Sequence, residues 1–140
     1  MLLRKCAGGI VFYKDSVLLL QNDKGEWILP KGLIRDDNSL EDTAIQRVRM
    51  EAGAQAEVVS KAGATSYEFY SSSRKQPVCN EITWFLMQAG SNDVVVSEAE
   101  GFFDGGFFPI EEALEKITYS QDKSLLRMAA EKYRDWVRIH

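Results

Sequence analysis

The residues best suited to chemistry are charged side chains on one predicted helix. Thr43, Arg47, Met50 and Glu51 are spaced i, i+4, i+7 and i+8, which places them on one arc of a helical wheel. Neighbours three and four apart converge beside a helix, so this arc pairs one guanidinium with one carboxylate. A guanidinium can hold a phosphate through two parallel hydrogen bonds. The arc predicts contact with a phosphorylated ligand, with a solvent-facing Arg47–Glu51 ion pair as the structural alternative.

Composition limits the functions that these side chains can serve. At 140 residues the chain suits one domain over 1–140, and its net charge of −4 argues against non-specific nucleic-acid binding. No apolar run approaches the ~20 residues that span a bilayer. Arg4 and Lys5 follow Met1 closely, which is not the pattern of a signal peptide. Cys6 and Cys79 suit a reduced compartment, with a disulfide between them as the alternative. We therefore expect a cytoplasmic protein with no nucleic-acid or membrane partner.

Short apolar and aromatic runs between turn residues predict the strands that must position the site. The expected strands are 7–12, 17–20, 27–29, 57–60, 65–70, 81–88 and 101–108. Residues 13–16 and 71–77 have the composition of hairpin turns, and Pro30-Lys31-Gly32 that of a turn that ends the third strand.

Capping residues predict three helices. Ser39 to Asp42 offers a capping-box start for a helix that ends near Ala52, with Gly53 as the left-handed residue after it. Pro109 suits the first turn of a short helix over 110–116, and Ser120 suits the cap of a terminal helix. The first helix should face the core with Ala44, Ile45, Val48 and Ala52. The terminal helix should do so with Leu125, Leu126, Ala129, Tyr133 and Trp136.

The segment 27–54 resembles the Nudix box, written G-x5-E-x7-R-E-U-x-E-E-x-G-U with U aliphatic. Gly32 and Gly53 have the separation of the two glycines, and Val48, Glu51 and Ala54 match their positions. The box is degenerate: Asn38, Gln46, Arg47 and Met50 stand where the family has Glu, Arg, Glu and Glu.

Further segments resemble the diadenosine tetraphosphate hydrolase branch of that family. They are 7–12, Trp27 with 29–32, 84–87 and 107–113, although Asn80 stands where that branch would place a phosphate-contacting Lys. The resemblance implies an α+β fold, a Nudix-type α/β/α sandwich with a mixed central β-sheet. It also implies metal-dependent hydrolysis of nucleoside-diphosphate-linked compounds.

In an intact box the arc carries glutamates that hold divalent metal against a diphosphate. Here it carries Glu51 and Arg47. A guanidinium ~5 Å from Mg²⁺ repels it by up to about 6 kcal/mol at an effective dielectric near 20. We therefore expect a domain that recognises a diadenosine polyphosphate-like compound, with Mg²⁺-dependent pyrophosphate hydrolysis weak or lost. The alternative is an active pyrophosphohydrolase that uses Glu51 with Glu41, Glu98 or Glu100, and a weaker option is a protein-binding scaffold.

The implied site combines these residues. Glu51 is the catalytic candidate, and Glu51 with Glu100 would ligate Mg²⁺ or Mn²⁺ if the chain is active; otherwise it needs no cofactor. Lys31, Gly32 and Arg47 are the phosphate-binding candidates, and Trp27 and Tyr67 the base-stacking ones. The expected partner is a small-molecule nucleotide or diphosphate ligand.

Aromatic residues leave alternatives open. At least two of Trp27, Tyr67, Phe69 and Trp84 should be core residues, because aromatics on strands usually are. The phenylalanines around Gly105-Gly106 could form a homodimer contact.

Overall fold

The computed structural model describes residues 1–35 and 37–140, and in it helices cover both faces of a mixed sheet. The strands are β1 (Leu2–Tyr13), β2 (Ser16–Asn22), β3 (Trp27–Ile28), β4 (Lys31–Leu33), β5 (Ala56–Ser71), β6 (Gln76–Ala89) and β7 (Phe102–Pro109). The helices are α1 (Leu40–Ala52), α2 (Ile110–Lys116) and α3 (Ser120–Ile139), with a single 3-10 turn, η1, at Glu98–Glu100. Residue 36, in the loop expected before α1, lies outside the described residues.

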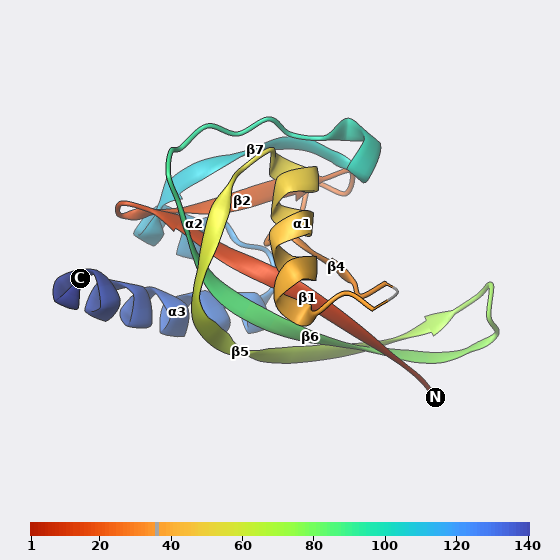
Figure 1. The fold of residues 1–140 in the computed structure, drawn as a ribbon. Helices are drawn as coiled ribbons and strands as arrows, with labels where there is room; N and C mark the ends of the chain where they lie inside the picture. The colour runs from red at the N-terminus through yellow and green to blue at the C-terminus, as the bar shows by residue number, and fades with distance from the viewer. Residues whose placement is uncertain (36) are drawn as a thin grey trace.

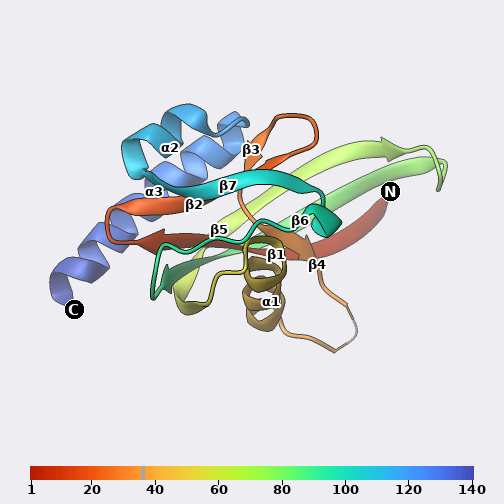
Figure 2. The ribbon, with the colours of Figure 1, turned by 90° about the horizontal axis from the view of Figure 1, so that it is seen from above.

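The sheet has the order β3-β2-β1-β6-β5, with β4 paired to β1 and β7 paired to β2. The β1–β6 pair is parallel, while the other pairs are antiparallel. Helix α1 covers one face, and α2 and α3 cover the other (Figure 2). The predicted α+β fold with a mixed central sheet is confirmed.

Each sheet face has its own apolar core. On the α1 face, Val48 and Ala52 pack with Val11 and Met87. On the opposite face, α3 packs its apolar stripe against β1 and β6, and Phe12 stacks on Tyr133 with ring centroids 4.4 Å apart. The predicted helix faces are confirmed, except that Ile45 and Trp136 are only partly buried.

Three element predictions are wrong in detail. Strands predicted at 57–60 and 65–70 form one continuous strand, β5, whose register shifts between Val58 and Ser60 and between Lys61 and Gly63. The two bulges let one strand bend while it stays paired to β6, so the polar residues between the predicted strands need no turn. Ser120 does not cap α3: it is the first helical residue, after Tyr119.

The third error concerns the predicted turn at Pro30-Lys31-Gly32. Residues Lys31–Leu33 form β4, because β1 extends beyond the end of β2 and offers free backbone groups there. Gly8 pairs with Lys31 and Ala7 with Gly32. Sequence propensity underestimates such a strand, since its stability comes from its partner.

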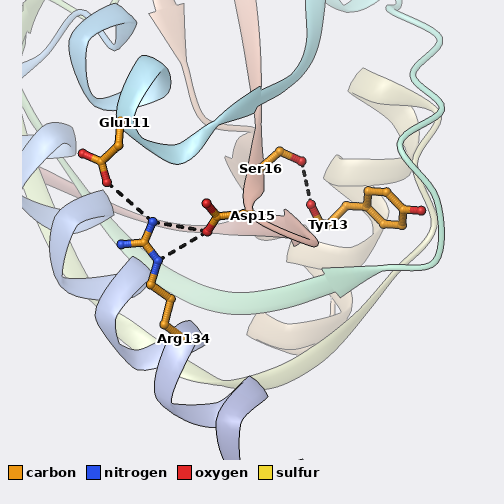
Figure 3. A network of polar contacts seen from close by, with 5 residues as sticks. All are labelled: Tyr13, Asp15, Ser16, Glu111 and Arg134. Atoms are coloured by element: carbon orange, nitrogen blue, oxygen red, sulfur yellow. Dashed lines mark hydrogen bonds and ion pairs between the residues drawn. The ribbon is translucent and has the colours of Figure 1, made fainter.

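An ion-pair network ties the β1–β2 hairpin to the helices. Arg134 on α3 reaches Asp15 Oδ1 at 3.2 Å and Glu111 Oε1 at 3.5 Å, while Ser16 Oγ donates to the Tyr13 carbonyl at 2.6 Å (Figure 3). The amide of Ile110 also donates to the Asp15 carbonyl at 3.1 Å. This network fixes where α2 begins relative to the sheet.

The β5–β6 hairpin projects beyond the helices at the end of the sheet where the N-terminus lies (Figures 1 and 2). Both cysteines, Cys6 and Cys79, are free thiols, so the disulfide alternative is wrong. No helix of the described chain is long and apolar enough to cross a bilayer.

Candidate functional site: a caged carboxylate beside a polar cleft

Helix α1 presents the charged arc because both of its ends are fixed. Ser39 Oγ accepts from the Asp42 amide at 3.1 Å, and Gly53 ends the helix in the left-handed region at φ 64°. The amides of Val95 and Ser97 donate to the carbonyls of Ala52 and Glu51 at 2.8 and 3.1 Å. The segment before η1 therefore closes over the last turn of α1.

Arg47 lies between two carboxylates. Its Nε donates to Glu51 Oε2 at 2.7 Å, and its Nη2 lies 2.6 Å from the same oxygen and 3.0 Å from Glu100 Oε2. The Glu51 side chain is only 2% exposed, against 22% for Arg47 and 28% for Glu100. The solvent-facing alternative for this pair is wrong, because the segment before η1 covers Glu51.

Burial controls the charges in this cluster. It raises the pKa of Glu51 to about 7, although the Arg47 and Lys31 charges oppose the shift. Burial alone would lower the pKa of Arg47, but the Glu51 and Glu100 carboxylates raise it above its ordinary value. Glu51 Oε1 is buried and has no hydrogen-bond partner among the described residues. The cluster is thus a tight ion pair with one unused acceptor.

Gly32 makes room for the guanidinium. A Cβ at this position would lie 2.6 Å from both Cδ and Nε of Arg47. No side chain fits there without displacing the Arg47 side chain, so β4 and α1 approach each other through this glycine. Met50 lies on the exposed side of the arc, with 49% of its surface accessible, and takes no part in the cluster.

Lys31 lies on the opposite side of β4 from Gly32, because successive strand residues alternate between faces. It lines a polar cleft of about 440 Å³. The cleft is lined by Asn22, Lys24, Glu26, Ile28, Lys31, Thr65, Tyr67, Ile82, Tyr119, Ser120, Gln121 and Asp122. Two predicted site residues, Lys31 and Tyr67, therefore share this cleft, while Gly32, Arg47, Glu51 and Glu100 meet behind β4.

The charge of Lys31 acts on both groups. It lowers the pKa of Glu51 and also that of Asp122, whose pKa is nevertheless raised by burial. Tyr119 donates to Glu26 across the cleft, and this bond lowers the pKa of Glu26 and raises that of Tyr119 to about 12. Lys31 is thus the side chain that links the cleft to the caged carboxylate.

The other candidates lie elsewhere. Trp27 does not line the cleft; it packs edge-on against Phe108, with Lys116 Nζ 4.5 Å from its ring centre. Trp84 is fully buried, whereas Tyr67 and Phe69 are 43% and 38% exposed. The expectation of at least two core aromatics therefore holds outright only for Trp84, with Trp27 half-buried against the core.

Sequence analysis missed most of the cleft wall. Asn22, Lys24 and Glu26 come from the β2–β3 turn, and Tyr119 and Asp122 come from the start of α3. These segments carry no common motif, and only the fold brings them together. The turn composition of residues 22–25 was the one available signal.

Comparison with known proteins places this geometry in a family. A family model described as the NUDIX domain matches residues 2–128. This chain belongs to the Nudix hydrolase family. A putative mutator protein, MutT4, from Mycobacterium tuberculosis is 28% identical over 110 residues, which is 75% of this chain. The chain spans only 41% of the length of that relative.

Solved structures show the same Nudix fold. An Ap4A hydrolase binary complex from C. elegans superposes with a TM-score of 0.74 at 19% identity, covering 94% of this chain and 98% of that one. A NUDIX hydrolase from Nitrosomonas europaea gives a TM-score of 0.75 at 18% identity, covering 96% of this chain and 74% of that one. At such identity the likeness concerns the fold alone.

Nudix hydrolases generally use divalent metals such as Mg²⁺ or Mn²⁺, so the donor set deserves a direct test. Within residues 1–35 and 37–140, no three His, Cys, Asp or Glu side chains are grouped to hold a metal ion. Glu51 and Glu100 approach each other, but the Arg47 guanidinium bonds to both. In this arrangement the carboxylates do not fit a divalent metal.

Proposed function

We propose that this Nudix domain binds a nucleoside-diphosphate-linked compound of the diadenosine polyphosphate kind, and that its Mg²⁺-dependent pyrophosphate hydrolysis is weak or lost. One observation carries the second part. The guanidinium of Arg47 bonds to Glu51 and Glu100, the two carboxylates nearest to a metal position. A cation already fills the place where positive charge would be needed.

The cleft supports the binding part. It presents Lys31 and Lys24 for phosphate and the exposed ring of Tyr67 for a base, and its volume of about 440 Å³ is within the usual range for a small-molecule site. We assign base stacking to Tyr67 rather than Trp27, which lies outside the lining. Arg47 uses Nε and Nη2 for the carboxylates, and within the described chain its Nη1 has no hydrogen-bond partner. That group can donate to a phosphate without breaking the ion pair.

A titration with ADP and diadenosine tetraphosphate tests both parts. We expect calorimetric binding with or without Mg²⁺ or Mn²⁺, and little product by chromatography, because loss of a positioned base alone costs about 10²–10⁴ in rate. Arg47→Gln should weaken binding. Arg49→Gln is the matched control, since Arg49 is an exposed cation on the same helix.

The opposite result is equally clear. Metal-dependent turnover that disappears in Glu51→Gln would show that the carboxylate works in catalysis, and the proposal of impaired hydrolysis would be wrong. Equal ADP affinity of Arg47→Gln and wild type would remove Arg47 from the phosphate site.

The unused Glu51 Oε1 favours a second candidate, an active pyrophosphohydrolase that uses Glu51 with Glu100. A buried acceptor without a partner is costly, and a metal ion or its bound water would satisfy it once Arg47 turns aside. Calorimetric Mn²⁺ binding by wild type, lost in Glu100→Gln, would support this candidate. Glu98→Gln is the control, because Glu98 lies in the same turn without contacting Arg47.

The remaining expectations stay predictions. A homodimer through the Gly105-Gly106 region has one supporting feature, Phe103, which is 59% exposed. Light scattering of the purified chain would decide it.

A further inference from the structure

Asn80 is a buried polar residue that neither the ion-pair cluster nor the cleft lining uses. It is only 5% exposed, in the middle of β6. Its Oδ1 accepts from Arg4 Nε at 2.9 Å, and its Nδ2 donates to the Tyr67 hydroxyl at 2.8 Å. A chain of hydrogen bonds therefore runs across three neighbouring strands, from β1 through β6 to β5.

The chemistry of these groups gives the chain one direction. An Arg side chain has donors and no acceptor, so only the oxygen of the Asn80 amide can face Arg4. The amide nitrogen must then face Tyr67, and because that nitrogen only donates, the Tyr67 oxygen accepts. The proton of the Tyr67 hydroxyl is left to point elsewhere.

That hydroxyl belongs to a residue of the cleft wall. Tyr67 lines the cleft with Lys31 and Lys24, and it is 43% exposed. Its ring is held from the side by Phe69, which stacks on it with centroids 5.9 Å apart, and the Arg4 guanidinium lies 5.6 Å from the Phe69 ring centre. The ring is thus fixed in position as well as the hydroxyl.

We propose that Arg4 and Asn80 are positioning residues that orient the Tyr67 hydroxyl as a hydrogen-bond donor to a phosphate oxygen of the bound ligand. A phosphate is the ligand group that fits, because it offers only acceptors at neutral charge balance with the two lysines of the same cleft. This assignment rests on the proposed function, since it concerns the phosphate end of the same ligand. It gives Tyr67 a polar role in addition to stacking.

Tyr67→Phe tests the donor, because it removes only the hydroxyl. We expect calorimetric affinity for ADP and for inorganic pyrophosphate to fall about ten-fold to a hundred-fold, as for a hydrogen bond to a charged group. Adenosine, which has no phosphate, should bind Tyr67→Phe and wild type equally. Tyr70→Phe is the matched control: Tyr70 is an exposed tyrosine on the same strand that does not line the cleft.

A double-mutant cycle tests the positioning role. Asn80→Leu should weaken ADP binding in the wild-type background and have no further effect in Tyr67→Phe, where no hydroxyl is left to orient. A purely structural role for Asn80 would instead lower ADP affinity equally in both backgrounds, and that result would overturn the proposal. Arg4→Met should give a smaller loss with the same dependence on the Tyr67 hydroxyl, and it leaves the buried amide in place if Asn80→Leu does not fold.

Failure of this proposal and of the proposed function can be told apart. If wild type binds neither ADP nor pyrophosphate, both fall together. If wild type binds them and Tyr67→Phe binds them equally well, only the donor role of Tyr67 is wrong.

Discussion

At the scale of single residues, the decisive feature is a carboxylate that the fold has taken out of water. Glu51 is 1% exposed, and one of its oxygens has an Arg47 partner while the other has none among the described residues. Removing a charge from water costs several kcal/mol unless it is paired. One ion pair compensates only in part, which is why the pKa of Glu51 lies near 7 and not below its ordinary value.

This shift predicts a dependence of stability on pH. Between the ordinary pKa of 4.5 and the folded-state value of about 7, the unfolded chain loses the Glu51 proton first. The folded state then holds more protons, so the contribution of Glu51 to the free energy of unfolding is fully present below pH 4.5 and is lost as pH rises through 7. The loss is at most about 3 kcal/mol.

Urea denaturation of wild type and Glu51→Gln across this pH range measures the effect. The wild type should lose stability relative to Glu51→Gln as pH rises, because glutamine does not titrate. Glu57→Gln is the control, since Glu57 is exposed. Parallel pH profiles for wild type and Glu51→Gln would contradict the assigned burial.

At the scale of elements, α1 is positioned by its ends. The Ser39 cap and the Gly53 stop were both predicted from the sequence, because capping is a local interaction between neighbours in the chain. The β4 strand was not predicted, because its stability comes from β1, which lies more than twenty residues earlier. The same holds for β5, whose length depends on continuous pairing with β6.

Gly53→Ala should destabilise the protein by about 1–2 kcal/mol, because alanine is strained at a φ of 64°. The added Cβ would also lie 3.1 Å from the Val95 Cβ, against the segment that covers Glu51. Thermal unfolding monitored by circular dichroism measures the loss. Gly90→Ala is the control, since a Cβ there meets nothing within 4 Å and should change stability by less than about 0.5 kcal/mol. Equal melting temperatures for the two variants would disprove the strain.

At the scale of the whole molecule, two cores hold helices on opposite faces of one sheet, and the cleft forms where these layers leave the sheet uncovered. Its walls are the β2–β3 turn and the start of α3, which are joined by the Tyr119–Glu26 hydrogen bond. The amide of Thr118 also donates to the Trp27 carbonyl at 3.0 Å. The position of α3 therefore sets the shape of the cleft.

Leu126→Ala should cost about 2–5 kcal/mol, because Leu126 is fully buried between α3 and the sheet and its truncation leaves a cavity. Guanidinium unfolding measures the change. Met128→Ala on the same helix should have little effect, since Met128 is 46% exposed. A loss below about 1 kcal/mol for Leu126→Ala would mean that α3 is not packed as described.

The sequence by itself determined the family, the order of the main elements and both ends of α1. These depend on local spacing: apolar periodicity, caps and the separation of Gly32 from Gly53 are all set by neighbours along the chain. It also indicated that Arg47 and Glu51 would pair, since residues four apart on a helix must meet.

Only the tertiary structure decided what that pair does. Burial of Glu51, the approach of Glu100 and the separation of Lys31 from Arg47 by the two faces of β4 arise from segments distant in sequence. The Arg4–Asn80–Tyr67 chain likewise crosses three strands. Solvent exclusion and strand pairing are properties of the assembled sheet, so no local pattern encodes them.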